Sequence, residues 1–250
     1  MKTLIIGYGT VGKNMHSIFR NADIHDPFLD INATAHYDVG FVCVPTDMLE
    51  DGSADTSIVE EAIESTKDMV DYFCIKSTVP PGTTQRLIDK GIKAVMSPEY
   101  FGGTQHANAV DYDFVILGGP RDNTSVVASC YQEVKPASLR ILQTDATTAE
   151  LVKYGENSFL AMKVSFANEF ARICKSFGVD YREWRELWLQ DPRINRSHTF
   201  VYEDKPYYES HCLTKDIPAI ISACIANGYS PELLLSMEEY NQQAKKKTQE

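Results

Sequence analysis

Residues 2–12 read KTLIIGYGTVG, and this stretch decides the fold of the first part of the chain. The apolar run predicts a short strand, and the glycines at positions 7, 9 and 12 then open a helix that reaches about residue 20 in the pattern G-x-G-x-x-G. The first glycine permits a tight turn, the second lets a pyrophosphate approach the backbone, and the third permits close helix packing. The N-terminus of the helix offers unpaired N–H groups to phosphates. The stretch therefore predicts a dinucleotide-binding turn, although an ordinary glycine turn is the alternative.

A carboxylate at the end of the next strand supports the dinucleotide interpretation. Residues 22–25 are predicted to form a second short strand, and Asp26 follows it, 19 residues after Gly7. A carboxylate in this place accepts hydrogen bonds from the adenosine ribose and disfavours a 2′-phosphate. The spacing therefore favours NAD over NADP.

Strands and helices continue to alternate up to about residue 118. We predict further strands at residues 39–44, 72–75, 93–96 and 114–118, and helices at residues 57–67 and 84–90. Strands that alternate with helices are typical of a parallel, doubly wound α/β sheet.

The second part of the chain is predicted to be all-helical. A long helix is expected over residues 146–177, because this stretch contains no proline and a single glycine. Shorter helices are expected at residues 181–189, 217–226 and 231–246, with an irregular segment at residues 193–211. We therefore place a domain boundary between residues 1–143, the nucleotide-binding domain, and residues 144–250, the helical domain.

Composition narrows the classes of protein to which the chain can belong. The 250 residues are 43% hydrophobic and carry a net charge of −11, which argues against a general nucleic-acid or anionic-membrane binder. No apolar run reaches the length of a membrane span. The six cysteines lack the paired spacing of metal sites, so we expect reduced thiols, no bound metal and a cytoplasmic location.

Four polar residues of the helical domain are candidates for chemistry. Lys153 and Asn157 lie four residues apart and share one helix face, where they can hold a developing alkoxide or simply face solvent. Cys212 is predicted to precede a helix that Asp216 caps and whose first turn contains Pro218. A helix N-terminus favours the thiolate of a nearby cysteine, so Cys212 is either a nucleophile or a structural thiol.

Taken together, these motifs resemble the UDP-glucose/GDP-mannose 6-dehydrogenase family through nearly all of the chain. The motifs that carry the resemblance, in order, are GYGTVG at 7–12, VPT at 44–46, KSTVPPGTT at 76–84, SPEYF at 97–101, Lys153 with Asn157, and CLTKD at 212–216. The resemblance implies a Rossmann-type NAD-binding domain followed by a helical domain, and a likeness to UDP-glucose 6-dehydrogenase.

The resemblance also implies a reaction and the residues that carry it out. Two hydride transfers to NAD oxidise the primary alcohol of a nucleotide sugar to an acid, through a thiohemiacetal and a thioester on Cys212. The catalytic residues implied are Cys212, Lys153, Asn157, Asp216, Glu99 and Thr78. The substrate-binding residues implied are Glu99, Tyr100, Phe101, Lys153 and Asn157. The cofactor-binding residues are Gly7, Gly9, Thr10, Val11, Gly12, Asp26, Val44, Pro45, Thr46 and Thr78.

The chain departs from the family pattern in two places. Family members continue into a second Rossmann-like domain that binds the nucleotide of the substrate, whereas this chain ends at Glu250. The family also has a glycine-rich stretch before the cysteine, where residues 207–211 here read YYESH, so we expect a filled or reshaped pocket. The alternatives are a two-electron hydroxyacid dehydrogenase and a non-catalytic NAD-binding subunit. Relatives dimerise through the helical region, so we expect a homodimer.

Overall fold

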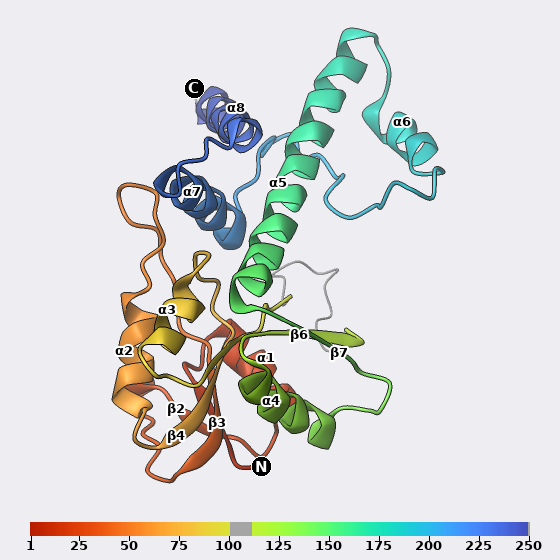
Figure 1. The fold of residues 1–250 in the computed structure, drawn as a ribbon. Coiled ribbons are helices and arrows are strands. Elements are labelled where there is room, and N and C mark those ends of the chain that lie inside the picture. Colours follow the sequence, from red (N-terminus) through yellow and green to blue (C-terminus); the bar gives the residue numbers. More distant parts are fainter. Residues whose placement is uncertain (101–111, 250) are drawn as a thin grey trace. The chain divides into compact units, whose positions relative to one another are not determined.

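A computed structural model describes residues 1–100 and 112–249 of the chain (Figure 1). The chain divides into two compact units. Unit 1 comprises Met1–Glu50 with Ala54–Lys153, and unit 2 comprises Asp51–Ser53 with Tyr154–Glu250. The division falls inside a long continuous helix, whereas the predicted boundary after residue 143 lies just before that helix and stays a prediction.

Unit 1 is built from short strands and helices that alternate along the chain. The elements are β1 (Thr3–Ile6), α1 (Thr10–Ile18), β2 (Asp23–His25), the 3-10 helix η1 (Pro27–Leu29), β3 (Tyr37–Val42), α2 (Ser57–Thr66), β4 (Val70–Ile75), α3 (Thr83–Asp89), β5 (Ala94–Met96), β6 (Phe114–Gly118), α4 (Arg121–Val134) and β7 (Arg140–Thr144). The sequence pattern predicts neither α4 nor β7. Helix α4 contains many residues of modest helix propensity, and burial of Val127, Ala128 and Tyr131 stabilises it.

The described strands form a seven-stranded sheet in the order β2-β1-β3-β4-β5-β6-β7. Strands β1 to β5 pair in parallel, which confirms the predicted doubly wound α/β class. The pairing of β5 with β6 is antiparallel, through Met96 and Gly118, so the sheet is mostly rather than wholly parallel. The chain crosses from one side of β1 to the other between β2 and β3. Ligands of such sheets bind beyond the carboxyl ends of the strands at this point.

Helices cover both faces of the sheet, which explains why its strands are almost continuously apolar. On one face, α1 and α4 pack on Ile5, Phe41 and Val95. On the other face, α2 and α3 pack on Leu4 and Ile6 together with further buried residues. Figure 1 shows these two helical layers on either side of the strands of unit 1.

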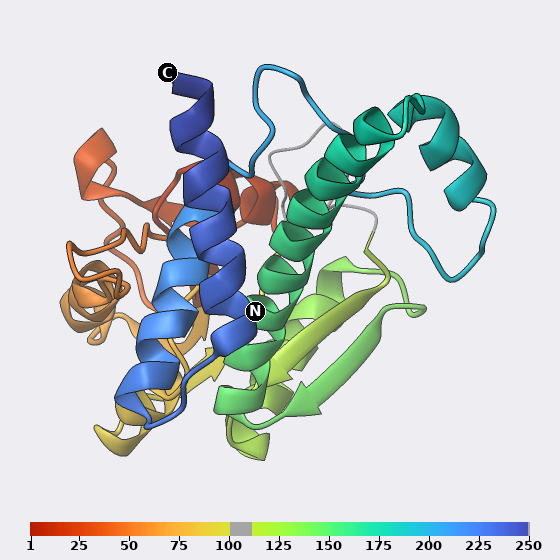
Figure 2. The ribbon, with the colours of Figure 1, turned by 90° about the horizontal axis from the view of Figure 1, so that it is seen from above.

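Unit 2 is helical among its described residues. The long helix α5 (Ala146–Ser176) begins in unit 1 and continues into unit 2, where it is followed by α6 (Tyr181–Trp188), α7 (His211–Ala226) and α8 (Glu232–Gln249). Helices α5, α7 and α8 enclose a second core, which is formed by Ala161, Tyr208, Leu213, Ile217, Ile221 and Met237. Figure 2 shows α8 lying across α7. None of the helices within residues 1–100 and 112–249 combines the length and apolar character that a membrane span requires.

Helix α7 begins six residues earlier than predicted. Ser210 is its N-cap, and the Ser210 hydroxyl accepts a hydrogen bond from the backbone N–H of Leu213 at 3.4 Å. Asp216 is therefore a buried residue of the helix interior and not its cap, and Cys212 lies within the first turn and not ahead of it. The prediction relied on Pro218, which favours a first turn. Here Pro218 lies inside the helix, where burial of Leu213 and Ile217 offsets the loss of one backbone hydrogen bond.

A fully buried carboxylate fastens α3 to the beginning of α5. The side chain of Glu150 accepts hydrogen bonds from the backbone N–H groups of Gly82 at 2.6 Å and Thr84 at 2.7 Å. These two donors belong to the N-terminus of α3, which no other side chain caps. Burial raises the pKa of Glu150, and the two backbone N–H donors oppose that rise. The carboxylate thus holds the loop after β4 against the helix that carries Lys153.

We predict that Glu150→Ala lowers the free energy of unfolding by about 3 kcal/mol, because two buried N–H groups lose their acceptor. Urea denaturation measures this loss. Glu150→Gln keeps one acceptor oxygen and is expected to lose less. The control Glu61→Ala removes an exposed carboxylate of α2 and is expected to change stability by less than about 0.5 kcal/mol. Equal stability of the Glu150→Ala and Glu61→Ala variants would contradict this role of Glu150.

Candidate active site

The glycine-rich turn between β1 and α1 leaves no room for side chains at two of its three glycines. A Cβ atom on Gly12 would lie 2.0 Å from the carbonyl oxygen of Gly7. Gly7 itself has a φ of +87°, which favours glycine, and its own Cβ would lie 3.0 Å from the carbonyl oxygen of Cys43. The turn therefore packs α1 directly onto the carboxyl end of β1, as the motif predicts.

The N-terminus of α1 fits a dinucleotide phosphate. Gly9 is the N-cap and supplies no side-chain hydrogen bond, and Thr10 and Val11 are the first two residues of the helix. A Cβ on Gly9 would meet no heavy atom of the described residues within 4 Å. Uncapped N–H groups beside open space are the arrangement that binds phosphate oxygens at a helix N-terminus. This part of the chain fits NAD.

Asp26 supports the glycine-rich turn from the neighbouring strand. It directly follows β2, and its carboxylate accepts hydrogen bonds from the backbone N–H groups of Tyr8 at 2.7 Å and Phe28 at 3.1 Å. The side chain is mostly buried, with 9% of the residue exposed. Each carboxylate oxygen can accept a further hydrogen bond, so Asp26 can hold the turn and also accept from a ribose hydroxyl.

The loops after β3 and β4 meet beside this turn. The Ser77 hydroxyl donates a hydrogen bond of 2.6 Å to the carbonyl oxygen of Val44, which joins the two loops. Pro45 is exposed, whereas Thr46 and Thr78 are buried. These residues lie at the carboxyl edge of the parallel strands, where the sequence analysis places the cofactor. Their contacts with NAD stay a prediction.

Glu99 and Lys153 form a buried ion pair in unit 1. The Nζ atom of Lys153 lies 3.8 Å from Oε1 of Glu99, and each side chain is less than 10% exposed. The same ammonium lies 5.4 Å from the centre of the Tyr100 ring, which adds a cation–π contact. The structure therefore brings together three residues that the sequence analysis assigned to one site. Phe101, also assigned there, lies outside the described residues.

Lys76 is a second buried cation in the same cluster. Its ammonium donates hydrogen bonds to the Ser97 hydroxyl at 3.0 Å and to the carbonyl oxygen of Pro98 at 3.1 Å. It thereby holds the backbone on which Glu99 is mounted. Burial lowers the pKa of Lys76, the negative charge of Glu99 opposes this shift, and the positive charge of Lys153 adds to it. In the sequence, Lys76 stands out only as part of the motif at residues 76–84. A lysine directly after an apolar strand is the signal that could have marked it as a buried cation.

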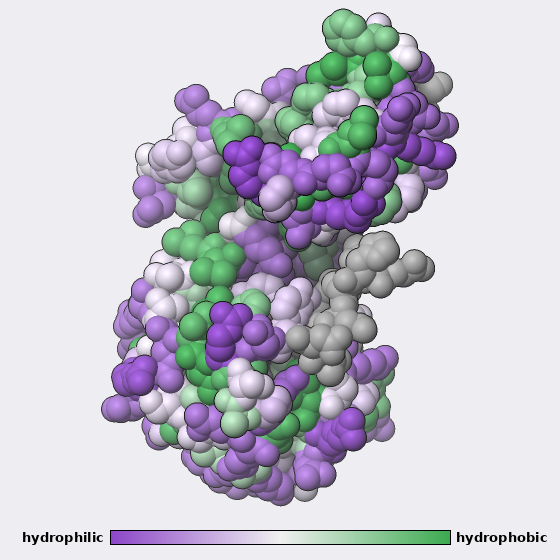
Figure 3. All heavy atoms as spheres, turned by 90° about the vertical axis from the view of Figure 1, so that its right-hand side faces the viewer, coloured by the Kyte–Doolittle hydropathy of each residue, from purple (hydrophilic) through white to green (hydrophobic). Residues whose placement is uncertain are grey.

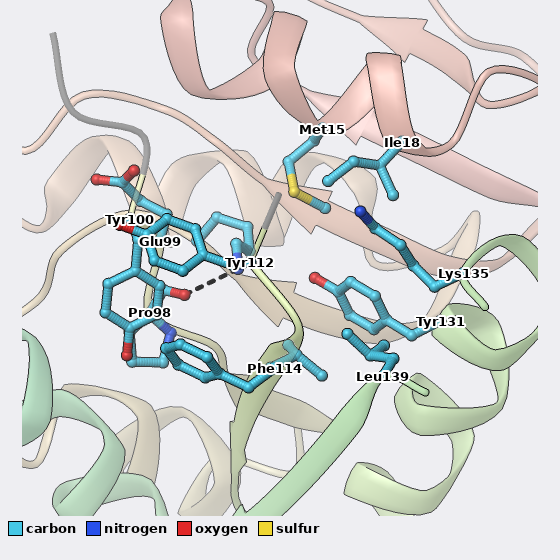
Figure 4. A pocket seen from close by; sticks show the side chains of 12 residues that line it. Met15, Ile18, Pro98, Glu99, Tyr100, Tyr112, Phe114, Tyr131, Lys135 and Leu139 are labelled. Carbon is cyan, nitrogen blue, oxygen red and sulfur yellow. Dashed lines mark hydrogen bonds between the residues drawn. The ribbon is translucent and has the colours of Figure 1, made fainter. Parts of the chain in front are cut away.

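A pocket opens beside Glu99 on the face of the sheet that α1 and α4 cover (Figure 4). Tyr100, Tyr112 and Phe114 pack against one another at one side, with ring centres between 5.2 and 5.6 Å apart. Tyr131 and Lys135 line the other side. The lining is therefore mostly aromatic and apolar, and the cavity of about 40 Å³ is far smaller than a typical small-molecule site.

Unit 2 holds a second buried polar cluster, on α5 and α7. The amide nitrogen of Asn157 donates a hydrogen bond of 2.6 Å to Oδ2 of Asp216, and Lys215 donates one of 2.6 Å to Oδ1. Asn157 and Asp216 are both less than 5% exposed. Asn157 and Asp216 are 59 residues apart in the sequence and are both predicted for one site. In the structure, a hydrogen bond connects them. Lys215 is an additional member that the sequence analysis did not assign to the site.

Cys212 lies one helical turn before Asp216 on α7, and the residue is partly exposed. It belongs to the first turn of a 16-residue helix, and Lys215 follows three residues later on the same face. A helix N-terminus favours a negatively charged sulfur, whereas the Lys215 ammonium is paired with Asp216. The other five cysteines are not in disulfides, and four of them are buried.

The segment before Cys212 has become part of the core. Tyr208 lies in the stretch that is glycine-rich in the family pattern; it is 3% exposed and packs among residues of α5, α7 and α8. Glu209 lies at the surface, where Lys205 and Lys245 pair with it. The sequence analysis expected these residues to fill or reshape a pocket. Tyr208 fills the core of unit 2, and the effect on a substrate pocket stays a prediction.

Two family models match the chain and together cover most of it. The first, described as the NAD binding domain of the UDP-glucose/GDP-mannose dehydrogenase family, matches residues 28–135. The second, described as the central domain of the same family, matches residues 147–243. Both matches confirm the resemblance that the motifs predict.

Curated proteins that are named as dehydrogenases of UDP-sugars are similar in sequence to much of the chain. UDP-glucose 6-dehydrogenase AglM of Haloferax volcanii is 32% identical over 239 residues, which cover 87% of this chain and 54% of the relative. UDP-N-acetyl-D-mannosamine dehydrogenase of Methanocaldococcus jannaschii is 33% identical over 191 residues, which cover 72% of this chain and 43% of the relative. The chain thus spans about half the length of the curated relatives it matches.

Solved structures share the fold. A UDP-glucose dehydrogenase from Pyrobaculum islandicum superimposes with a TM-score of 0.80 at 24% identity, covering 97% of this chain and 68% of the other. The UDP-D-ManNAc dehydrogenase of Pyrococcus horikoshii gives a TM-score of 0.79 at 24% identity, covering 98% and 69%.

We predict that two glycine substitutions separate packing from cofactor binding. Gly12→Ala is expected to lower both the melting temperature and the affinity for NADH, because its methyl group collides with the Gly7 carbonyl. Gly9→Ala is expected to leave the melting temperature unchanged and to weaken NADH binding about tenfold, because its methyl group enters the space that the pyrophosphate needs. NADH fluorescence titration and thermal melting measure both effects. Wild-type affinity in Gly9→Ala would contradict the placement of the pyrophosphate at this turn.

Proposed function

Because this chain belongs to the UDP-glucose/GDP-mannose dehydrogenase family, we propose that it oxidises the primary alcohol of a nucleotide sugar to a carboxylate, with Cys212 as a covalent nucleophile. NAD is the cofactor that the matched NAD-binding family model indicates. Relatives named for UDP-glucose and for UDP-N-acetyl-D-mannosamine suggest a uridine-linked sugar as the substrate. The buried residues Cys43, Cys74, Cys130 and Cys174 are not in disulfides, which fits a reducing compartment such as the cytoplasm.

The observation that carries the proposal is the buried cluster around Asp216 beside a partly exposed thiol. Burying a carboxylate with an amide and an ammonium bound to it costs desolvation free energy in a helical core. The presence of this cluster beside the thiol therefore supports a chemical role. A nucleophilic thiolate needs such groups nearby, because its reaction moves protons and leaves an oxyanion. A two-electron hydroxyacid dehydrogenase has no need of the thiol.

The proposed reaction conserves atoms and electrons. The alcohol loses one hydride and one proton and becomes an aldehyde, and the Cys212 sulfur adds to its carbonyl carbon to form a thiohemiacetal. Loss of a second hydride and a proton gives a thioester, and water then breaks the carbon–sulfur bond to release the carboxylate and the thiolate. When bound, NAD accepts a hydride at each oxidation, so one alcohol, one water and two NAD⁺ yield two NADH, one carboxylate and three protons. The covalent bond keeps the reactive aldehyde on the protein between the two oxidations.

The other residues are assigned by their charge and hydrogen-bonding capacity. Lys153 and Asn157 lie one turn apart on α5, and we assign them to the developing alkoxide. Asp216, held by Asn157, is suited to moving a proton at the sugar oxygen or at water. Glu99 is assigned to the water that attacks the thioester, and Thr78 to water beside the nicotinamide. Tyr100 adjoins Glu99 and is assigned to the sugar, and the family motif assigns Phe101 there too.

We predict that the wild-type chain forms two NADH per carboxylate from a nucleotide sugar, and that Cys212→Ser lowers the rate of carboxylate formation about a thousandfold. A panel of UDP-sugars and simpler alcohols, with NADH absorbance and product mass as readouts, tests this. Cys224→Ser is the matched control, because Cys224 is the other partly exposed cysteine and lies on the same helix; it is expected to retain wild-type rates.

The remaining outcomes identify the alternatives. Full turnover by Cys212→Ser, with one NADH per product, supports a two-electron hydroxyacid dehydrogenase. Binding of NADH without turnover by the wild-type chain on any member of the panel supports a non-catalytic NAD-binding subunit.

We also propose that the protein is a homodimer that forms through α5. Val152, Phe159, Phe166 and Ile173 recur at seven-residue intervals along this helix, and each is between 37% and 60% exposed. A seven-residue spacing places them in one apolar stripe, which suits the packing of a second helix. Phe166 continues through Phe170 into a stacked aromatic row with Trp184 and Trp188 of α6. Figure 3 also shows exposed hydrophobic residues of unit 2, in green, at the top of the view.

We predict that light scattering at micromolar concentration gives the mass of two chains. Phe159→Glu and Phe166→Glu are expected to give single chains, because each places a charge in the apolar stripe. Phe28→Glu is the control, since Phe28 is 93% exposed on a different element, and it is expected to leave the dimer intact. A single-chain mass for the wild-type protein would refute the dimer.

A further inference from the structure

One buried asparagine of α8 clamps the backbone just before the proposed nucleophile. The Oδ1 atom of Asn241 accepts a hydrogen bond of 2.8 Å from the backbone N–H of Tyr208, and its Nδ2 donates one of 3.2 Å to the carbonyl oxygen of the same residue. Asn241 is 2% exposed and Tyr208 is 3% exposed. A side-chain amide here supplies the donor and the acceptor that a neighbouring strand would supply. Aspartate lacks the donor, and leucine lacks both groups.

The Tyr208 side chain adds a further hydrogen bond to α8. Its hydroxyl donates a hydrogen bond to Glu238, one turn before Asn241 on α8, and its ring lies in the core with Ala161 and Leu213. Burial raises the pKa of Tyr208, so the hydroxyl remains a hydrogen-bond donor at neutral pH. The backbone at Tyr208 is therefore held by two hydrogen bonds and the side chain by a third, all to α8.

The clamp is only four residues from Cys212. Ser210 lies between them and is the N-cap of α7: its hydroxyl accepts from the Leu213 N–H and its carbonyl oxygen from the Thr214 N–H at 3.1 Å. Displacement of Tyr208 would move this cap directly. Because Cys212 lies in the first turn, the cap determines how the helix N-terminus is presented to its sulfur.

We propose that Asn241 is a positioning residue for Cys212, which holds the N-terminus of α7 by clamping the Tyr208 backbone to α8. The role of the thiol in this inference rests on the proposed function, whereas the clamp can be measured without turnover.

Hydrogen–deuterium exchange of the full chain tests the clamp. In Asn241→Leu, which keeps a similar volume but removes both hydrogen bonds, the amides of Tyr208, Leu213 and Thr214 are expected to exchange at least about tenfold faster. Tyr208→Phe keeps both backbone hydrogen bonds and is expected to exchange within about threefold of the wild type at these amides. Met237→Ala is the control for general loss of stability, because Met237 packs in the same core and contributes none of the hydrogen bonds of the clamp.

The pH profile of Cys212 alkylation by iodoacetamide, followed by peptide mass spectrometry, tests the consequence for the thiol. Loosening the helix N-terminus removes stabilisation of the thiolate, so the midpoint of the profile is expected to move up by about half a pH unit in Asn241→Leu. Tyr208→Phe and Met237→Ala are expected to keep the wild-type midpoint.

Two results would overturn the inference. One is that Asn241→Leu accelerates exchange evenly throughout unit 2, as a general loss of stability does. The other is that its alkylation profile matches that of the wild type. Failure of the wild-type chain to oxidise any nucleotide sugar refutes the proposed function instead, and leaves both readouts valid for the clamp.

Discussion

The carboxylate of Glu150 is the constraint on which the arrangement of unit 1 depends. It is fully buried and accepts hydrogen bonds from two N–H groups at the start of α3, so the loop that follows β4 is tied to the first turns of α5. Thr78 lies in that loop and Lys153 on that helix. A buried carboxylate is stable only when donors surround it, and here the donors are backbone groups that have no other cap. The Glu150 carboxylate accepts hydrogen bonds from the N-terminus of α3, and these N–H groups in turn stabilise the buried negative charge.

The candidate active site follows the same rule twice more. In unit 1, Glu99 is paired with Lys153, and the buried Lys76 holds the backbone at Pro98. In unit 2, Asp216 is paired with Asn157 and Lys215. Each cluster pairs its carboxylate with one cationic group, and Asp216 accepts a further hydrogen bond from Asn157. The result is a set of charged groups with fixed positions, and fixed charges stabilise a transition state without having to reorganise during the reaction.

Much of the fold could be predicted because it follows from local rules. The glycine spacing at positions 7, 9 and 12 reflects steric contacts within one turn, and the apolar strands reflect a sheet covered on both faces. The antiparallel pairing of β6 has no local signal, because strand direction depends on how the chain returns to the sheet. The sequence predicts the start of α7 too late, because the preference of proline for the first turn of a helix concerns a single residue. Core burial along the helix outweighed it.

The candidate site shows the same division. The sequence by itself determined which residue types are available: a dinucleotide turn, a lysine and an asparagine one turn apart, and a cysteine followed four residues later by an aspartate. Only the tertiary structure decided their partners. It paired Asn157 with Asp216 across 59 residues and Tyr208 with Asn241 across 33. Motif spacing is local, whereas a buried polar group must find its partner wherever packing places one, and that partner is set by the folded core as a whole.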